Sequence, residues 1–375
     1  MKIDRITTHR LFECEIPPEK WATYTKEKTF DEWLEDDDFR ERWIAFDDVM
    51  FNPNDGLIYV GLTALNGDCF YTFDPSTAEF RSLGFPTHGD PYANKIHKAL
   101  TLGADGCIYG AIATLADVDV WERAPGGKLF RYDPVTGKYD FLGIPMPHEY
   151  IQCIKVDEGR GIIYGSTFPG YNIFRYDIAD ERTRQLCHVG AAATEHLGLD
   201  ADGGVWHNYH LFQWAARYPL LRYDPDRDEI DFLNLDLPDA VPERQDSTQI
   251  DSTLTTRDGT LYMGTCGGGL ARVDHRARVV ENLGRPSEHR RAKIIEDPDG
   301  EHLFGACGVF GDTRLFTCHR ASGRFTDLGP IVSEDGTHCW QAHEIAAVDD
   351  HTLYVAECDN HERASYLFQV DLADD

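Results

Sequence analysis

The sequence lacks several features that define common protein classes. It contains no run of about 18 apolar residues, so no transmembrane helix is expected. Residues 1–5 do not begin the apolar run of a signal peptide. The ten cysteines are dispersed singly and no CxxC pair occurs, which disfavours a zinc ribbon or a thioredoxin-type pair. We therefore expect a reduced, cytoplasmic protein whose cysteines mostly act as small core residues.

Basic residues are scarce as well. The chain has 36 lysines and arginines against 65 aspartates and glutamates, which gives a formal net charge of -29. A nucleic acid or an anionic membrane surface requires a basic face, so neither is expected as a partner. Walker, GxSxG and HExxH motifs are also missing.

The hydrophobic content is nevertheless high. Hydrophobic residues make up 42% of the 375 residues and aromatic residues 12%, which is enough for a large core. This length exceeds that of one ordinary compact domain. The chain is therefore either two domains or one array of repeats.

A repeated pattern favours the array. An apolar strand, a turn with Asp or Gly, and an apolar–aromatic–small segment recur seven times. The aligned aromatic residues are Tyr59, Tyr109, Tyr164, Trp206, Tyr262, Phe304 and Tyr354. A second recurring segment, clearest at Phe130-Arg131-Tyr132-Asp133-Pro134, is followed by a turn and a last strand. Four short strands in each unit of about 40–55 residues are typical of a β-propeller.

We predict an all-β fold: a seven-bladed β-propeller of four-stranded antiparallel blades in a single domain, residues 1–375. The seventh unit lacks its outer strand, and the N-terminal segment 3–16 can supply it and close the ring. Residues 18–43 are expected to form a short helical insertion. The predicted blades cover residues 44–85, 95–145, 150–188, 193–235, 247–284, 290–330, and 340–372 together with 3–16.

The inner strands of a propeller line its channel and converge at one face, where sites are usually found. Aligning the units on their aromatic residues predicts a ring at this mouth. Its members are Asp48, Lys98, Gln152, Glu195, Asp251, Arg291 and Glu344, or the residue before each of them, with a shift of one residue left open. A solvated pore with scattered ion pairs is the simplest interpretation of this ring.

The fourth unit departs from the repeat. His207, Tyr209, His210 and Arg217 stand in or just after its second strand, where other units have small residues. Because such departures often mark functional sites, we predict catalytic roles for these four residues and for His97. The alternative is that the histidines bond to backbone in a packed loop. The predicted substrate-binding residues are Lys98, Gln152, His196, Trp214, Arg290 and Arg291.

A second cluster opens the seventh unit. His338, Gln341 and His343 offer imidazole and amide groups, which can share a divalent metal ion. We predict one such ion here, with manganese, calcium and zinc left open, and no organic cofactor. The alternative is one pore histidine beside a hydrogen-bonded loop.

The chain resembles the seven-bladed propeller polysaccharide lyases of the oligogalacturonate, ulvan and rhamnose–glucuronate lyase types. The resemblance covers nearly the whole chain through units such as FRYDP…TGKYDFLG. These families have a central His/Tyr/Arg site, or a His-rich site in which a glutamine helps to hold a divalent metal. The first arrangement is similar to His207, Tyr209, His210 and Arg217 here, and the second to His338, Gln341 and His343 in residue types.

The resemblance implies a carbohydrate-active lyase that cleaves a uronic-acid-containing oligo- or polysaccharide by β-elimination at the channel mouth. That reaction needs a base and a cation to neutralise the substrate carboxylate. His207 or His97 is the candidate base, Tyr209 the acid and Arg217 the neutralising group. With an acidic oligosaccharide as partner, positive charge has to be concentrated at the mouth.

Two other classes of function stay open. The first is a non-catalytic interaction scaffold, because a propeller fold does not fix function. The second is a propeller hydrolase or an antibiotic-ring lyase with a metal site at His343 and Glu344.

Overall fold

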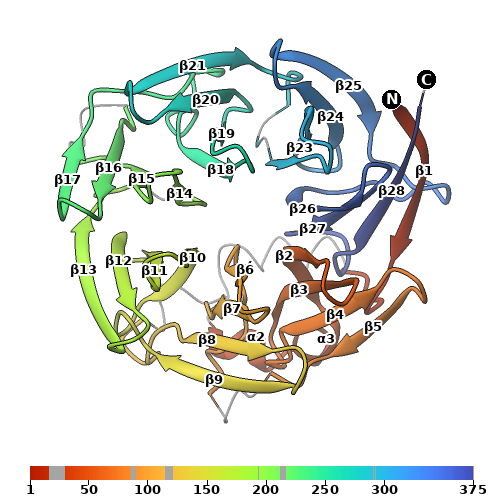
Figure 1. Cartoon of the computed structure of the whole chain (residues 1–375). Helices are drawn as coiled ribbons and strands as arrows, with labels where there is room; N and C mark the ends of the chain where they lie inside the picture. Colours follow the sequence, from red (N-terminus) through yellow and green to blue (C-terminus); the bar gives the residue numbers. More distant parts are fainter. Residues whose placement is uncertain are drawn as a thin grey trace.

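The computed structural model is a closed ring of seven blades (Figure 1). It describes residues 1–16, 30–85, 90–114, 121–192, 194–211, 217–289, 291 and 293–374. Each blade is a sheet of four antiparallel strands, and the innermost strand of each lies nearest the ring centre. The prediction of an all-β, seven-bladed propeller is confirmed.

The strands of each blade run outward from the channel. Blades one to four contain β2 (Ile44–Asn52), β3 (Leu57–Ala64), β4 (Phe70–Asp74) and β5 (Glu79–Ser82); β6 (Leu100–Leu102), β7 (Ile108–Ala111), β8 (Leu129–Asp133) and β9 (Lys138–Gly143); β10 (Tyr150–Asp157), β11 (Ile162–Phe168), β12 (Asn172–Asp177) and β13 (Arg182–His188); and β14 (Gly198–Leu199), β15 (Val205–Asn208), β16 (Leu220–Asp224) and β17 (Glu229–Phe232). Blades five to seven contain β18 (Ile250–Thr255), β19 (Leu261–Thr265), β20 (Leu270–Asp274) and β21 (Val279–Gly284); β22 (Lys293–Glu296), β23 (His302–Cys307), β24 (Arg314–His319) and β25 (Arg324–Pro330); and β26 (Ala342–Asp349), β27 (Thr352–Glu357), β28 (Leu367–Ala373) and β1 (Lys2–His9).

The N-terminal strand closes the ring as predicted. β1 pairs antiparallel with β28, and Ile6 lies opposite Val370. Ile6 is the one buried residue of β1 and belongs to the core shared by blades six and seven. The two termini consequently lie side by side at the edge of the ring (Figure 1).

The predicted helical insertion is present in its described part. α2 (Phe30–Leu34) and α3 (Asp37–Arg42) precede the first blade. Asp36 caps α3, because its side chain accepts a hydrogen bond from Phe39 N. Residues 18–29 of the predicted insertion lie outside the described residues.

The small residue of the repeat makes room for an aromatic ring. In three blades, a Cβ added to the glycine of the second strand would lie 2.1–2.3 Å from a phenylalanine ring of the third strand. These pairs are Gly110–Phe130, Gly165–Phe174 and Gly305–Phe316. The sequence therefore alternates aromatic and small residues so that each blade can pack flat on its neighbour.

The Arg and Asp residues of the repeat hold its turns. Asp133 Oδ1 accepts a hydrogen bond from Val135 N, which closes the turn between β8 and β9. Arg131 pairs with Asp105 of the preceding turn at 2.9 Å. These residues are structural, which accounts for their recurrence.

The cysteines behave as the sequence suggests. All ten are free, and every one except Cys187 is buried. Among the described residues, no helix has the length and apolar character needed to span a membrane.

Candidate functional site

Irregularities near the start of the inner strands place polar side chains in the channel. In four blades one residue is skipped in the pairing of the inner strand with the second strand. The skipped residues are Asp47, Gln152, Asp251 and His343. Such bulges re-aim a side chain. In blades one and seven, the skipped residue is therefore the earlier of the two residues that the sequence alignment left open. In blades three and five it is the later one.

Two histidines meet at the centre of this ring. The rings of His97 and His343 have centroids 4.7 Å apart, and both residues are buried. Nδ1 of His97 lies 2.7 Å from Gln152 O, and Nδ1 of His343 lies 2.6 Å from Asp47 O. A carbonyl oxygen only accepts, so each Nδ1 is the donor and each neutral ring carries its lone pair on Nε2.

Both Nε2 atoms lie near one carboxylate oxygen. Oε2 of Glu195 is 3.4 Å from His97 Nε2 and 4.0 Å from His343 Nε2. This oxygen is buried and has no hydrogen-bond partner within the described part of the chain. Two lone pairs facing a carboxylate repel each other unless a proton or a cation lies between them. We call His97, His343 and Glu195 the channel triad, and its geometry favours uptake of a proton or a cation.

Three cations surround the channel triad, and two of them, Lys98 and Lys293, are buried. Lys98 Nζ lies 3.4 Å from Glu195 Oε2 and donates to Asp251 O at 3.2 Å. Lys293 Nζ lies 2.7 Å from Asp251 Oδ2, and Arg291 lies 3.8 Å from Asp251 and 3.9 Å from Glu195. Glu344 is ionised and also acts on Lys98, so three positive groups face three carboxylates, and the local charge is close to balanced.

The protonation states follow from this environment. Burial, together with the nearby Lys98, holds the pKa of His343 well below its usual range, so its imidazole is neutral at pH 7. Burial alone would raise the pKa of Glu195, but Lys98, His97 and Arg291 more than offset burial and hold it well below its usual range. A neutral imidazole thus faces an ionised carboxylate.

Two further acidic residues, Glu344 and Asp48, belong to the same ring of channel residues. Nε2 of His196 donates to Glu344 Oε2 at 3.1 Å, and burial lowers the pKa of His196 to about 3. Asp48 Oδ2 accepts a hydrogen bond from Leu100 N at 2.7 Å. Burial, and then the neighbouring Glu344, raise the pKa of Asp48 to about 7. Asp48 is therefore a carboxyl group that titrates near neutral pH.

The predicted metal ligands are not brought together. His338 is exposed, and Gln341 Nε2 donates to Cys358 Sγ at 3.2 Å. Only His343 reaches the channel, where Asp47, His97 and His343 offer one ligand atom each within 4.8 Å of one another. Imidazole and carboxylate suit a divalent transition metal.

The charges around this set oppose a metal ion. One carboxylate oxygen of Asp47 lies 3.5 Å from Lys95 Nζ, and the other accepts a hydrogen bond from Thr63. A dication would have to compete with Lys95 for Asp47. The donor atoms are of types that bind a metal ion, but the positive charge of Lys95 disfavours an ion at this place.

The predicted residues of the fourth blade bond mainly to backbone. His207 is buried, with Nδ1 2.5 Å from Asn208 O, and burial lowers its pKa to about 4. Tyr209 OH donates to Leu233 O at 3.1 Å, and His210 Nδ1 donates to Arg217 O at 2.9 Å. The Arg217 side chain is 52% exposed and pairs with Asp236. None of these contacts reaches the channel triad.

The predicted substrate-binding residues divide into three groups. Lys98, His196 and Arg291 lie in the channel, and Gln152 contributes its carbonyl oxygen to His97. Trp214 and Arg290 lie outside the described residues.

The sequence suggested no site role for Lys293, Asp48, Glu195 or Asp251, and Glu344 was named only in the alternative with a metal site. The acidic residues could have been recognised as site residues from their positions in the aligned ring of inner-strand residues. Lys293 has no such signal, because it follows the aligned position of blade six and is recognised only through its contact with Asp251.

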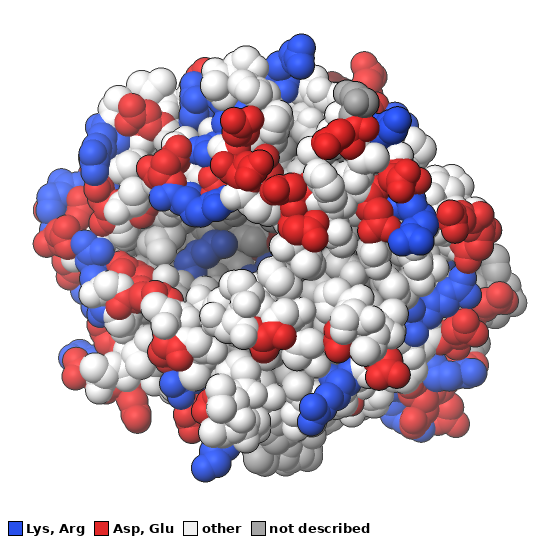
Figure 2. Space-filling model, turned by 45° about the vertical axis from the view of Figure 1, so that its right-hand side comes forward, with Lys and Arg blue, Asp and Glu red and all other residues white. Residues whose placement is uncertain are grey.

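The distribution of charge at the mouth is mixed. Figure 2 shows a hollow on the ring face with Lys and Arg side chains inside it and acidic side chains along parts of its border. Lys98 and Arg291 both lie beside carboxylates. Basic and acidic groups of the channel thus lie side by side.

Comparisons with known proteins support the fold. Neither a protein-family model nor a curated protein sequence matches the chain. Similar solved structures include a catalytically inactive histidine-to-alanine variant of virginiamycin B lyase from Staphylococcus aureus with quinupristin (14% identity, TM-score 0.60), which covers 88% of this chain and 96% of its own. The selenomethionine form of that lyase is 13% identical with a TM-score of 0.60. A streptogramin B lyase is 14% identical with a TM-score of 0.62, and both structures cover 88% of this chain and 95% of their own. None of the three is a polysaccharide lyase, and at this identity the similarity concerns the seven-bladed propeller fold.

Proposed function

We propose that the chain is a lyase that works at the mouth of its central channel. It would remove a proton from a carbon next to a carbonyl group and expel an oxygen leaving group from the neighbouring carbon. The observation that carries the proposal is the channel triad, in which His97 Nε2 faces the ionised Glu195 at 3.4 Å. The lyase names of the structural neighbours agree with it.

His97 is the proposed base. Its Nδ1–H is fixed by Gln152 O, so the Nε2 lone pair is held toward the channel. When Nε2 takes the substrate proton, Glu195 stabilises the imidazolium that forms. The same imidazolium then returns its proton to the leaving oxygen as the carbon–oxygen bond breaks. The step consumes no water and needs no other reactant.

The cations have a separate role. Removal of the proton leaves negative charge on the carbonyl oxygen, and this charge must be stabilised for the reaction to proceed. Lys98 and Arg291 lie beside Glu195 and supply fixed positive charge in a site shielded from water.

An antibiotic-ring substrate fits this site better than a uronate. A uronate carries a carboxylate and requires an unpaired cation, whereas Lys98, Lys293 and Arg291 all have carboxylate neighbours. An antibiotic ring that is closed through a neutral carbonyl group carries no carboxylate there, so it needs no unpaired cation. The structural neighbours are also named for streptogramin-type antibiotics, one of them with quinupristin.

An acidic oligosaccharide is the second candidate. Phe310 is 63% exposed, its ring centroid lies 6.0 Å from that of Trp340, and Trp340 lies 5.0 Å from His361. Phe310 connects the second and third strands of blade six, Trp340 precedes β26, and His361 connects the second and third strands of blade seven. All three therefore lie at the end of the blades where the inner strands begin. Exposed aromatic faces of this kind can stack on sugar rings.

Product analysis tests the proposal. The protein is incubated with quinupristin and, separately, with glucuronate, iduronate and galacturonate oligosaccharides, with and without a chelator. We expect quinupristin to be opened without a gain in mass, because elimination adds no water. His302→Ala, on the second strand of blade six, should keep this activity and His97→Ala should lose it. Products that gain a water, or no product from any substrate, would contradict a lyase. Loss of turnover with chelator would make His97 a metal ligand rather than the base.

A further inference from the structure

Three aromatic side chains and one carboxylate lie on neighbouring loops of blades six and seven. The ring centroids of Phe310, Trp340 and His361 are 5.0–6.0 Å apart. Asp359 precedes His361 by two residues in the loop between β27 and β28. We call these four residues the mouth cluster. Phe310 is exposed, and Trp340 and His361 are partly exposed, so the rings are open to a ligand.

A buried carboxylate holds these loops in place. Glu357 is fully buried, and its Oε1 accepts a hydrogen bond from Trp340 N at 2.7 Å. Arg363, on the loop that carries the cluster, pairs with the same carboxylate at 2.6 Å. On the other side, Gly311 N donates to Trp340 O at 2.8 Å, which ties the loop of Phe310 to blade seven. The mouth cluster is therefore preorganised, and a ligand needs to order little of the protein on binding.

Asp359 connects the mouth cluster electrostatically to the channel. Burial lowers the pKa of Lys95, but Asp47 and then Asp359 raise it above its usual range. Lys95 lies 3.5 Å from Asp47 and precedes His97 by two residues. Asp359 is exposed, accepts a hydrogen bond from Cys358 Sγ at 3.6 Å, and pairs with no lysine or arginine among the described residues. A positive group of a ligand can therefore neutralise this carboxylate beside the channel.

The charge around the rings favours a cation. Burial lowers the pKa of His361, although Asp359 and Glu362 oppose this, so its imidazole is neutral at pH 7 and does not repel a cation. The face of an aromatic ring attracts a cation. The net charge of -29 raises the concentration of cations near the protein. A uronate, by contrast, would meet Asp359 as a like charge.

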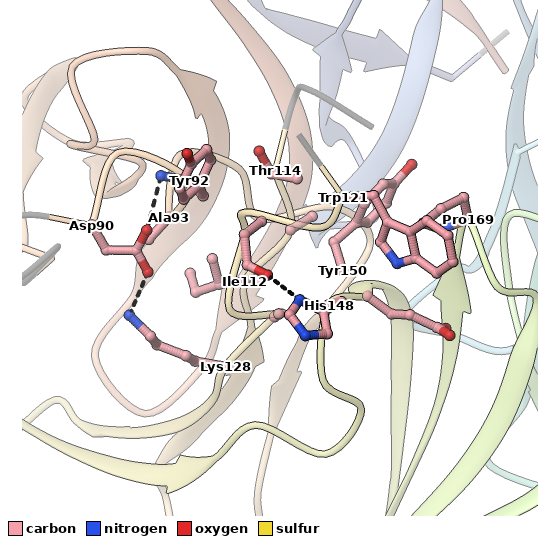
Figure 3. A pocket seen from close by; sticks show the side chains of 15 residues that line it. Asp90, Tyr92, Ala93, Ile112, Thr114, Trp121, Lys128, His148, Tyr150 and Pro169 are labelled. Atoms are coloured by element: carbon pink, nitrogen blue, oxygen red, sulfur yellow. Dashed lines mark hydrogen bonds and ion pairs between the residues drawn. The ribbon is translucent and has the colours of Figure 1, made fainter. Parts of the chain in front are cut away.

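The pocket on blades two and three offers no comparable space (Figure 3). Its interior has room for about one water molecule. Figure 3 shows Lys128 paired with Asp90, and this distance is 2.8 Å. A ring-sized group of a substrate therefore finds room at the mouth cluster rather than in this pocket.

We infer that the mouth cluster is a substrate subsite for a protonated amine carried on an apolar ring. The apolar ring packs on Trp340 and Phe310, and the ammonium group pairs with Asp359. The inference rests on the proposed lyase in linking this subsite to the reaction. Trp340 precedes His343 of the channel triad by three residues, which span at most about 11 Å. One substrate can therefore occupy the mouth cluster and place its reacting carbon at the channel triad.

Three probes of similar shape and different charge test the subsite: benzylamine, benzyl alcohol and benzoate. In NMR titrations at pH 7, we expect the wild type to bind benzylamine severalfold more tightly than benzyl alcohol, and benzoate least. Asp359→Asn should weaken only benzylamine, because asparagine tolerates the same left-handed backbone (φ 49°) without the charge. Trp340→Ala should weaken both benzylamine and benzyl alcohol. Glu281→Gln, an exposed acid on the outer strand of blade five, is the control and should bind like the wild type.

Two results of these titrations would overturn the subsite. The first is equal affinity of the wild type for benzylamine and benzoate. The second is an Asp359→Asn protein that binds benzylamine as tightly as the wild type. A preference for benzylamine that persists in Asp359→Asn would likewise show that this carboxylate does not recognise the amine.

Quinupristin turnover links the mouth cluster to the reaction. Trp340→Ala should raise KM about tenfold with kcat nearly unchanged, and benzylamine should inhibit competitively. An unchanged KM in Trp340→Ala overturns the subsite even if quinupristin is opened. Benzylamine binding that depends on Asp359, without turnover of any substrate, would instead sustain the amine site and overturn the lyase.

Discussion

The side chains of the channel are arranged so that each histidine has one fixed proton. His97 and His343 both donate from Nδ1 to a backbone carbonyl of the next blade. This leaves both Nε2 lone pairs directed at Glu195, a carboxylate that nearby cations keep ionised. A proton that either Nε2 takes from a substrate is therefore stabilised by the Glu195 carboxylate.

Glu195→Gln tests the role of this carboxylate. The amide keeps the shape of the side chain but removes the charge that stabilises the imidazolium of His97. We expect kcat to fall about a hundredfold with little change in KM, and the acid limb of the pH–kcat profile to move to lower pH. Glu281→Gln, an exposed acid paired with Arg272, is the control and should behave as wild type. An equal loss in both variants, or a loss confined to KM, would contradict this role.

Asp48→Asn tests whether the buried Asp48 carboxyl titrates near neutral pH. Burial raises the pKa of Asp48 from 3.8 to about 7, so its proton stabilises the fold. That contribution is complete below about pH 4 and is lost as the pH rises through 7. The variant should therefore be more stable than the wild type at pH 8, by about 3 kcal/mol, and nearly equal at pH 4. Urea unfolding at the two pH values measures this, and a difference independent of pH would contradict it.

At the scale of elements, the N-terminal strand keeps the ring closed. β1 provides the outer strand of blade seven and buries Ile6 in the core shared with blade six. Without β1, β28 would present an unpaired edge.

Ile6→Ala measures this closure. It leaves a cavity in that core and should lower the free energy of unfolding by about 2–4 kcal/mol. Arg5→Ala on the same strand removes only an exposed ion pair with Asp371 and should stay close to wild type. Equal stability of the two variants in denaturant titrations would mean that β1 is not part of the cooperative fold.

At the scale of the whole molecule, the fold could be predicted from the sequence because its determinants are local and repeated. The aromatic residues at 59, 109 and the equivalent positions recur with their small neighbours, and the turn aspartates recur with them. The closing role of the N-terminus followed from counting strands. Each of these signals lies within a stretch of a few residues.

The site could be predicted only in part, because it is assembled across the ring. Lys98 reaches Asp251, 153 residues away, and His196 reaches Glu344, 148 residues away. Whether Asp47 or Asp48 enters the channel depends on a bulge that shifts the register by one residue. The histidines of the fourth blade break the repeat, yet they bond to backbone and, at His207, to the Thr194 hydroxyl. The alignment of inner strands, which uses the repeat itself, placed Lys98, Glu195 and Asp251 correctly in the channel.

The most direct test of the central claim is the mass and rate of the product formed from quinupristin by wild type and His97→Ala. The account predicts that the wild type opens the ring to a product of unchanged mass. It also predicts that His97→Ala slows this by at least about a hundredfold while circular dichroism shows an intact propeller. A product one water heavier, or a His97→Ala protein that opens the ring at the wild-type rate, would contradict elimination by the channel triad.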